Sequence, residues 1–334
     1  MTAPGAISKV CTALKAYWTG GTWLRWEVFL GAVLVADLVL NAVVSPYFLD
    51  PLTLSDATFN FTEKALIALP MALLIIGREI DVSVAGILAL SSVVMGLGAE
   101  HGLGTPALVG LGLTTGAACG AANGALVALL RVPSIVATIG TMSLFRGVAA
   151  GVLGDRVLKN YPESFHWFGQ GYVIGVISFE LVLFTVCVGL FSIYLHLTLF
   201  GRRLYALGSN PEAARFAGVR LTRYRFWLFV ATGLASGLAA VLLTSRLGST
   251  RPSIAQGWEL EVISMVILGG VSVAGGRGTI PGVALAAVLL GFVTYGLGLA
   301  NIPGIVMQII VGALLIVVVG LPIVGKRLQA RAHR

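Results

Sequence analysis

The feature that most constrains this chain is a succession of apolar segments separated by short polar connections. They lie at about residues 28–44, 63–77, 82–98, 106–130, 133–153, 174–198, 225–245, 259–274, 279–299 and 303–323. A bilayer-spanning helix needs ~20 predominantly apolar residues, and most of these segments are long enough. The second, third and eighth are short, so each needs flanking residues or a broken helix. The sequence therefore predicts an all-α polytopic membrane protein with about ten transmembrane helices.

Composition agrees with a chain embedded in a membrane. Of the 334 residues, 57% are hydrophobic and only 11% are charged, which is far outside the range of soluble domains. The net charge of +8 is concentrated in the connections between apolar segments, so we interpret it as a signal for orientation and not as a nucleic-acid footprint. No soluble domain is left over, and residues 1–334 are predicted to form a single transmembrane domain.

Basic residues predict the orientation of this domain. They occur in the first 27 residues, in the connection at 199–224 and in the tail at 324–334, whereas the loop at 45–62 has Asp50 and Asp56 but no basic residue. The positive-inside rule places basic connections in the cytoplasm. Both termini are therefore expected to be cytoplasmic, with residues 1–27 cytoplasmic or interfacial. Some basic residues fall on the predicted outer side and weaken this pattern: Arg156, Lys159, Arg246 and Arg251.

The connection at 199–224 contains a short segment with helix signals at both ends. Asn210 is a good N-cap, Pro211 suits the first helical position, and Glu212 complements the positive end of a helix. Gly218 supplies a stop after about two turns. The segment 211–217 is thus predicted to be a short isolated helix, with Ala213, Phe216 and Ala217 on one side. Such a helix is too small to fold alone, so it is either a docking element or part of a solvated linker.

This segment carries a resemblance to a known family. The pattern Gly-(x)6-Gly-Ser-Asn-Pro-Glu-Ala-Ala-Arg-Phe-Ala-Gly at 201–218 resembles the cytoplasmic coupling segment of ABC-importer permeases of the ribose/xylose/arabinose type. In that family the helix is taken to press into a groove on the ATP-hydrolysing subunit. The resemblance implies these coupling residues: Gly208, Asn210, Pro211, Glu212, Ala213, Ala214, Arg215 and Gly218.

The same resemblance implies partners and a location. It implies a bacterial inner-membrane protein that works with an ABC ATPase, a second permease subunit (identical or related) and a periplasmic sugar-binding protein. ATP and magnesium would bind to the ATPase, so no cofactor is expected on this chain. The histidines are isolated, and no nucleophile elbow or metal-binding pair is present, which predicts a transport subunit and not an enzyme.

Two further motifs resemble this family. The run Gly77-Arg-Glu-Ile-Asp-Val-Ser-Val is similar to the family signature Gly-Gly-Ile-Asp-Leu-Ser-Val, from which Arg78 and Glu79 depart. These charges predict a break or re-entrant turn in which Arg78 neutralises one acid. The stretch from Arg246 to Thr279 resembles the Gly-x-Glu-Leu element and its glycine-rich continuation. Shorter motifs are most similar to rhamnose-uptake permeases, with autoinducer-type permeases second; nothing in the spans themselves selects one sugar.

Polar residues within the apolar segments are candidates for a translocation path. Such side chains usually face a cavity or a partner helix, because lipid offers them no hydrogen bonds. The candidates are Asp37, Asn41, Asp81, Ser134, Thr138, Thr141, Glu259 and Glu261. Asp37 and Asn41 share a helix face and either line the path or bond to a neighbouring helix. The hydroxyls can serve as helix packing, and the two glutamates can form salt bridges near the headgroups.

A second class of transporter remains open at this point. Asp37 suits an ion or proton site of a secondary transporter, although that class does not explain the capped helix at 211–217. Gly112, Gly116, Gly120 and Gly124 recur every four residues and predict a bare ridge along one helix. Such a ridge lets a neighbouring backbone approach closely, so we assign it to packing.

Overall fold

The computed structural model describes residues 23–307, 309–310, 312–313 and 316. Most of the predicted N-terminal segment 1–27, the basic tail 324–334 and the end of the apolar segment 303–323 lie outside the described residues. Inside them, six helices are long and apolar enough to cross a membrane, or up to seven if one bent pair counts as a single span. The expectation of ten spans and the placement of the C-terminus stay predictions.

The described residues fold mainly into helices. They are α2 (Trp23–Val44), α3 (Pro51–Phe59), α4 (Thr62–Ile76), α5 (Val84–Glu100), α6 (Thr105–Gly124) with the π-helix η1 (Ala125–Leu129), α7 (Ser134–Leu153), α8 (Glu163–Gln170), α9 (Phe179–Leu197), α10 (Leu199–Ser209), α11 (Pro211–Phe216), α12 (Leu221–Leu247), α13 (Trp258–Leu268) and α14 (Ile280–Leu299). An antiparallel hairpin of β1 (Tyr172–Ile174) and β2 (Ile177–Ser178) follows α8. This hairpin is the one sheet among the described residues. The sequence did not predict it.

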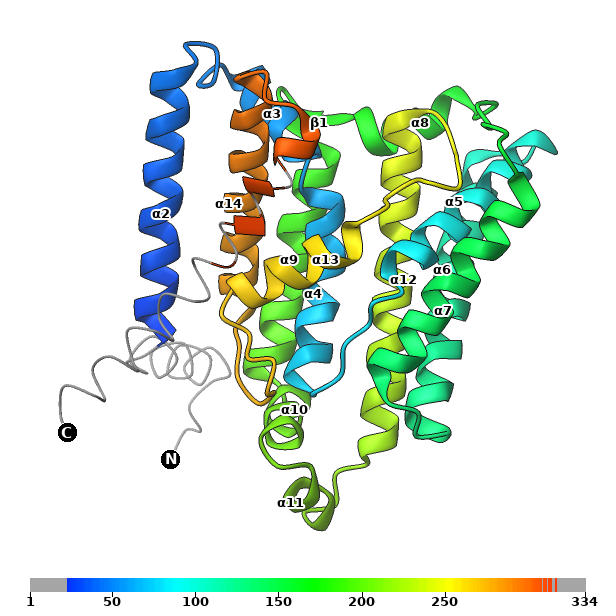
Figure 1. Cartoon of the computed structure of the whole chain (residues 1–334), viewed down its shortest axis with the longest axis vertical. Helices are drawn as coiled ribbons and strands as arrows, with labels where there is room; N and C mark the ends of the chain where they lie inside the picture. The colour runs from blue at the N-terminus through cyan, green and yellow to red at the C-terminus, as the bar shows by residue number, and fades with distance from the viewer. Residues whose placement is uncertain (1–22, 308, 311, 314–315, 317–334) are drawn as a thin grey trace, which may run out of the picture.

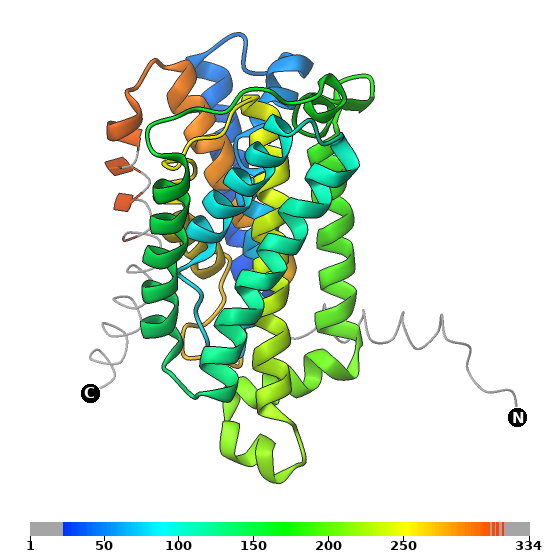
Figure 2. The same ribbon diagram turned by 90° about the vertical axis from the view of Figure 1, so that its right-hand side faces the viewer.

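The long helices stand side by side and define two ends (Figure 1). The α11 end carries α10 and α11, which project beyond the bundle; the opposite end, here the α8 end, carries α3, α8 and the hairpin. Helix α2 stands at one edge beside α14, and α5, α6 and α7 form the other side (Figures 1 and 2). Helix α2 begins at the α11 end (Figure 1).

Two of the short apolar segments are interrupted helices. Helices α3 and α4 meet at a bend of 49°. The segment predicted to span at 259–274 is not one spanning helix, because α13 has only 11 residues and ends at Leu268. Beyond it the backbone turns at Gly270, Gly275 and Gly276, all with positive φ, which only glycine adopts at little steric cost. Both α4 and α13 are thus followed by non-helical backbone within the bundle.

The glycine ridge packs as predicted. It lies on α6 against α12, where an added Cβ at Gly116 would overlap the carbonyl oxygen of Gly233 and one at Gly120 would overlap that of Phe229. Helices in lipid associate chiefly through close packing of this kind. The ridge therefore joins α6 and α12 backbone to backbone, and it fixes the centre of the bundle.

We expect leucine at Gly116 to destabilise the protein by at least ~2 kcal/mol, because overpacked helix contacts must separate. The matched control is leucine at Gly110 on the same helix, where an added Cβ meets nothing within 4 Å. Thermal unfolding of the detergent-solubilised variants, followed by size-exclusion chromatography, measures both. Equal melting temperatures for the two variants would contradict the assignment of the ridge to packing.

A buried ion pair explains one exception to the charge pattern. Arg246 Nε and Nη2 donate to the two carboxylate oxygens of Glu63, at 2.8 and 2.9 Å, and the Glu63 side chain is fully buried. Thr62 donates to Glu180 at 2.5 Å beside this pair. Arg246 is thus a partly buried residue that ties α12 to α4, and it is not a fully exposed charge of an outer loop.

Removing this arginine should be costly. Arg246→Met leaves the Glu63 carboxylate buried without its partner, and breaking one side of a buried pair typically costs ~3–5 kcal/mol. We expect little folded Arg246→Met protein in the membrane. Arg251→Met, which removes an exposed arginine a few residues away, serves as the control and should accumulate normally. Normal amounts of stable Arg246→Met protein would contradict this role of the pair.

Candidate functional site

The predicted capped helix is present as α11. Asn210 Oδ1 accepts hydrogen bonds from the backbone N–H groups of Glu212 and Ala213, both at 3.1 Å. Pro211 occupies the first turn, and Gly218 ends the segment with φ +82°. The helix closes at Phe216, one residue before the predicted end. Local signals in the sequence therefore located this helix correctly.

The packed face of α11 is the one that carries Ala214. Ala214 is the buried residue of the helix, with 4% of its surface exposed, whereas the Phe216 side chain is 92% exposed. The side predicted to carry Ala213, Phe216 and Ala217 is exposed. A large aromatic side chain held almost fully in the open at the tip of a protruding helix is a typical anchor for a partner. Helix α11 thus presents an aromatic group away from the bundle.

The connection at 199–224 also contains a helix that the sequence analysis missed. Helix α10 precedes α11 and buries Leu204 and Leu207 against the bundle, while Arg202 and Arg203 are exposed. Tyr205 Oη donates to the carbonyl of Gly278 at 2.6 Å. The apolar spacing of Leu204 and Leu207 was the available signal, but the neighbouring arginines favoured a loop. Helix α10 anchors α11 to the rest of the protein.

The end of α10 meets two interrupted segments, and we call this contact the α10 junction: residues 76–78, 208–209 and 274–276. An added Cβ at Gly208 would overlap both the Ile76 carbonyl oxygen and the Gly276 amide nitrogen. The Gly276 N–H itself donates to the Ile76 carbonyl at 2.9 Å. Three stretches far apart in the sequence thus touch through their backbones.

Arg78 holds the α10 junction together. Its Nε donates to the Ala274 carbonyl at 2.8 Å, and its Nη2 donates to the Ser209 carbonyl at 2.9 Å. The residue has φ +66°, a conformation that costs a non-glycine residue free energy. The expectation that Arg78 neutralises an acid is wrong: Glu79 instead forms an ion pair with Arg225 of α12 at 2.7 Å.

The rest of the 77–83 segment contacts two further helices, α6 and α7. Ile80 N–H donates to Ser134 Oγ of α7 at 3.4 Å, and Thr138 Oγ1 lies 3.5 Å from the Ile80 carbonyl. Asp81 Oδ1 accepts from Ser83 Oγ at 2.6 Å, and Asn123 of α6 donates to Ser83 Oγ at 2.7 Å. Ser134, Thr138 and Asp81, three of the predicted path residues, therefore gather on this one segment.

The other predicted path residues lie elsewhere. Thr141 is one turn further along α7 and bonds back to the Thr138 carbonyl at 3.3 Å. Asn41 on α2 faces α14, where its Nδ2 lies 3.5 Å from the Phe292 carbonyl. Asp37 is one turn away on the same edge helix. Glu259 and Glu261 are on α13, and Glu261 pairs with Lys64 of α4. The structure thus separates the candidates into three groups.

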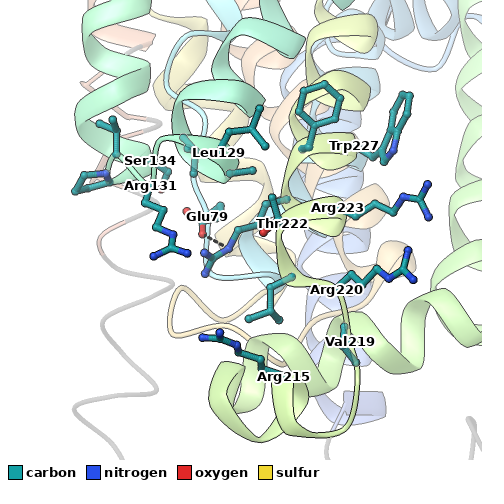
Figure 3. Close-up of a pocket in the computed structure, with 17 residues that line it drawn as sticks. Glu79, Leu129, Arg131, Ser134, Arg215, Val219, Arg220, Thr222, Arg223 and Trp227 are labelled. Carbon is teal, nitrogen blue, oxygen red and sulfur yellow. Dashed lines mark ion pairs between the residues drawn. The ribbon is translucent and has the colours of Figure 1, made fainter.

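A basic cavity of about 980 Å³ opens beside α11 (Figure 3). Its charged lining residues are Glu79, Arg131, Arg215, Arg220, Arg223 and Arg225. Figure 3 shows Glu79, Arg131 and Arg215 on one side of the start of α12, and Arg220 and Arg223 on the other. Arg131 follows the π-helix η1 and has φ +59°. Among the described residues, no group of His, Cys, Asp and Glu is arranged to hold a metal ion.

Comparison with known proteins places this geometry in context. Residues 54–319 match the model of the family described as branched-chain amino acid transport system / permease component. The chain is 35% identical over 300 residues to the autoinducer 2 import system permease protein LsrD of Escherichia coli K12 and to that of Shigella flexneri. The alignments cover 88% of this chain and 91% of each relative. No solved structure gives a significant match.

Proposed function

The chain belongs to the permease-component family of branched-chain amino acid and sugar ABC transport systems, and we propose that it is the membrane-spanning subunit of an importer powered by a partner ATPase. Family membership accounts for its multi-pass architecture and its place in the inner membrane. The observation that carries the proposed mechanism is the α10 junction. It joins the protruding α10–α11 element directly to two interrupted segments inside the bundle.

The charge distribution supports contact between α11 and a cytoplasmic partner. Arginines gather at the α11 end, where the positive-inside rule predicts cytoplasm: Arg78, Arg131, Arg202, Arg203, Arg215, Arg220, Arg223, Arg225 and Arg277. We infer that the ATPase binds α11 and that the exposed Phe216 side chain is an apolar anchor in this contact. The basic cavity beside α11 offers a second surface for acidic groups of the same partner.

The proposed mechanism passes motion from α11 to the membrane segments. When ATP closes the ATPase pair, α11 moves and α10 moves with it, because Asn210 ends α10 and caps α11. The α10 junction then shifts residues 77–83, which are bonded to α6, α7 and α12. A second permease subunit completes the path, and a binding protein delivers the substrate to the α8 end. The two subunits rock between outward-open and inward-open states.

For the substrate, we propose a small polyhydroxylated molecule of the autoinducer-2 type. The relatives named above support this choice over rhamnose, which rests on short motifs in the sequence alone. The substrate is expected to bind weakly within the membrane, so that it leaves readily.

Uptake in cells tests both the energy source and the substrate. Cells expressing this chain together with an importer ATPase, a second permease subunit and a periplasmic binding protein are given labelled autoinducer-2 or labelled L-rhamnose. We expect accumulation of autoinducer-2 that persists when a protonophore is added while cellular ATP is kept high. Accumulation of rhamnose alone would contradict the proposal that the substrate is of the autoinducer-2 type. Collapse of uptake with the protonophore would favour an ion-coupled secondary transporter and overturn the importer.

A further inference from the structure

A second cavity, of about 690 Å³, lies between α4, α13, α14 and the residues Gly304, Met307 and Gly312 beyond α14. Resting on the proposed function, we propose that this cavity holds the polyhydroxylated substrate during its passage through the membrane. The volume falls in the range of roughly 300–1,000 Å³ that is typical of small-molecule sites. Its polar lining comes from three different elements: Asn60, Lys64, Glu261, Ser264, Thr294 and Tyr295. Only Glu261 among these was a candidate from the sequence.

An ion pair on the cavity wall is the strongest sign of a ligand. Lys64 of α4 pairs with Glu261 of α13, and their side chains are 16% and 32% exposed. Lys64 Nζ also lies 4.9 Å from the centre of the Trp258 ring, which holds the ammonium group in place. Charges within spanning segments are costly and typically mark a substrate pathway. Glu261 thus reaches the cavity, whereas Glu63, the acid that pairs with Arg246, is fully buried.

The chemistry of the wall suits a neutral polyol. The Lys64 ammonium donates hydrogen bonds and the Glu261 carboxylate accepts them, so adjacent hydroxyls of one ligand can bond to both. Asn60, Ser264, Thr294 and Tyr295 add further donors and acceptors. The leucine, methionine and glycine residues that complete the lining match the C–H faces of a sugar-like ring. The basic cavity at the α11 end, lined by guanidinium groups, lacks this balance.

The backbone also supports a substrate site here. Helix α13 begins inside the bundle, well short of its α8 end (Figure 1). The residues before it turn sharply, with φ +55° at Ala255 and φ +87° at Gly257. Non-helical backbone at membrane depth is tolerated where protein or a water-filled cavity covers it. In transporters, binding sites commonly form at such discontinuous helices.

The first test removes both charges together, so that neither is left unpaired. In the complete transporter, Lys64→Met combined with Glu261→Gln should raise the KM for uptake of autoinducer-2 about tenfold, equivalent to ~1.4 kcal/mol of lost binding. Lys159→Met removes an exposed lysine from a loop and should leave KM unchanged. An unchanged KM in the double variant would overturn the proposal.

A second measurement does not depend on the stability of that double variant. Ser264→Cys, in a background without the native cysteines at positions 11, 119 and 187, places a thiol on the cavity wall. Excess autoinducer-2 should slow its reaction with a small thiol reagent at least about fivefold. Equal labelling rates with and without substrate would overturn the site. If ATP-dependent uptake persists in that case, the importer assignment stands, and only the assignment of the substrate to this cavity is wrong.

Discussion

Proline in place of Ala214 is expected to abolish ATP-driven uptake while the protein still inserts into the membrane. The Ala214 N–H donates to the Asn210 carbonyl at 3.0 Å. Proline removes this bond and its ring clashes with the same carbonyl, at a typical cost of ~3 kcal/mol or more inside a helix. A helix that runs only from Pro211 to Phe216 has no further turns to absorb that cost. Phe216 then loses its position for docking.

The measurement is retention of the ATPase during purification, together with substrate-stimulated ATP hydrolysis. Both should be lost in Ala214→Pro. Ala214→Ser keeps the amide and the small size of the buried side chain, so it should behave like the wild type. Because the spanning helices are not built on α11, the proline variant should still bind its partner permease. Normal ATPase retention in Ala214→Pro would contradict the assignment of α11 as the docking helix.

Replacing Arg78 should uncouple ATP hydrolysis from transport. Arg78→Ala deletes two hydrogen bonds from a charged donor, worth ~1.5–3 kcal/mol each, and keeps a residue with a Cβ at positive φ. Arg78→Gly deletes the same bonds but relieves the backbone strain of ~1 kcal/mol or more. If the bonds matter for coupling, both variants should lose most of their uptake while the ATPase stays bound and active. The two variants should differ only in their free energy of unfolding, and Arg78→Gly should be the more stable.

The variants Arg78→Ala and Arg78→Gly distinguish two possible roles of Arg78. A purely structural role predicts that uptake follows stability, so that Arg78→Gly transports better than Arg78→Ala. A coupling role predicts equal loss of transport per ATP hydrolysed in both variants. The ratio of substrate imported to ATP hydrolysed, measured in reconstituted vesicles, distinguishes them. A normal ratio in Arg78→Gly would show that the α10 junction does not depend on this side chain.

Elements with local signals could be predicted from the sequence. Helix α11 was located from Asn210, Pro211 and Gly218 because caps act on their nearest neighbours. The glycine ridge was assigned to packing because its four-residue spacing places it on one helix face. The interruption after Gly77 was also expected, since charged residues there break an apolar run. The prediction failed for the partners of Arg78, which lie 131 and 196 residues away along the chain.

Long-range contacts also explain what was missed in the candidate sites. Lys64 stood inside an apolar segment, and that position was a usable sign of function. Its partner Glu261 was noted for a different reason, and only the fold brings the two together. Tyr295 and Thr294 carry no distinguishing pattern in the sequence. Arg246 was taken as an outer-loop charge because its buried partner, Glu63, is 183 residues away.

Transport by the purified components tests the central claim most directly. The chain is reconstituted into liposomes with its partner permease, the ATPase and the binding protein, with labelled autoinducer-2 on the binding-protein side. We predict accumulation only when hydrolysable ATP is supplied to the ATPase side, and none with the Ala214→Pro variant. Accumulation driven by an ion gradient without ATP, and equal in Ala214→Pro, would contradict the assignment of this chain as the permease of an ATP-driven importer.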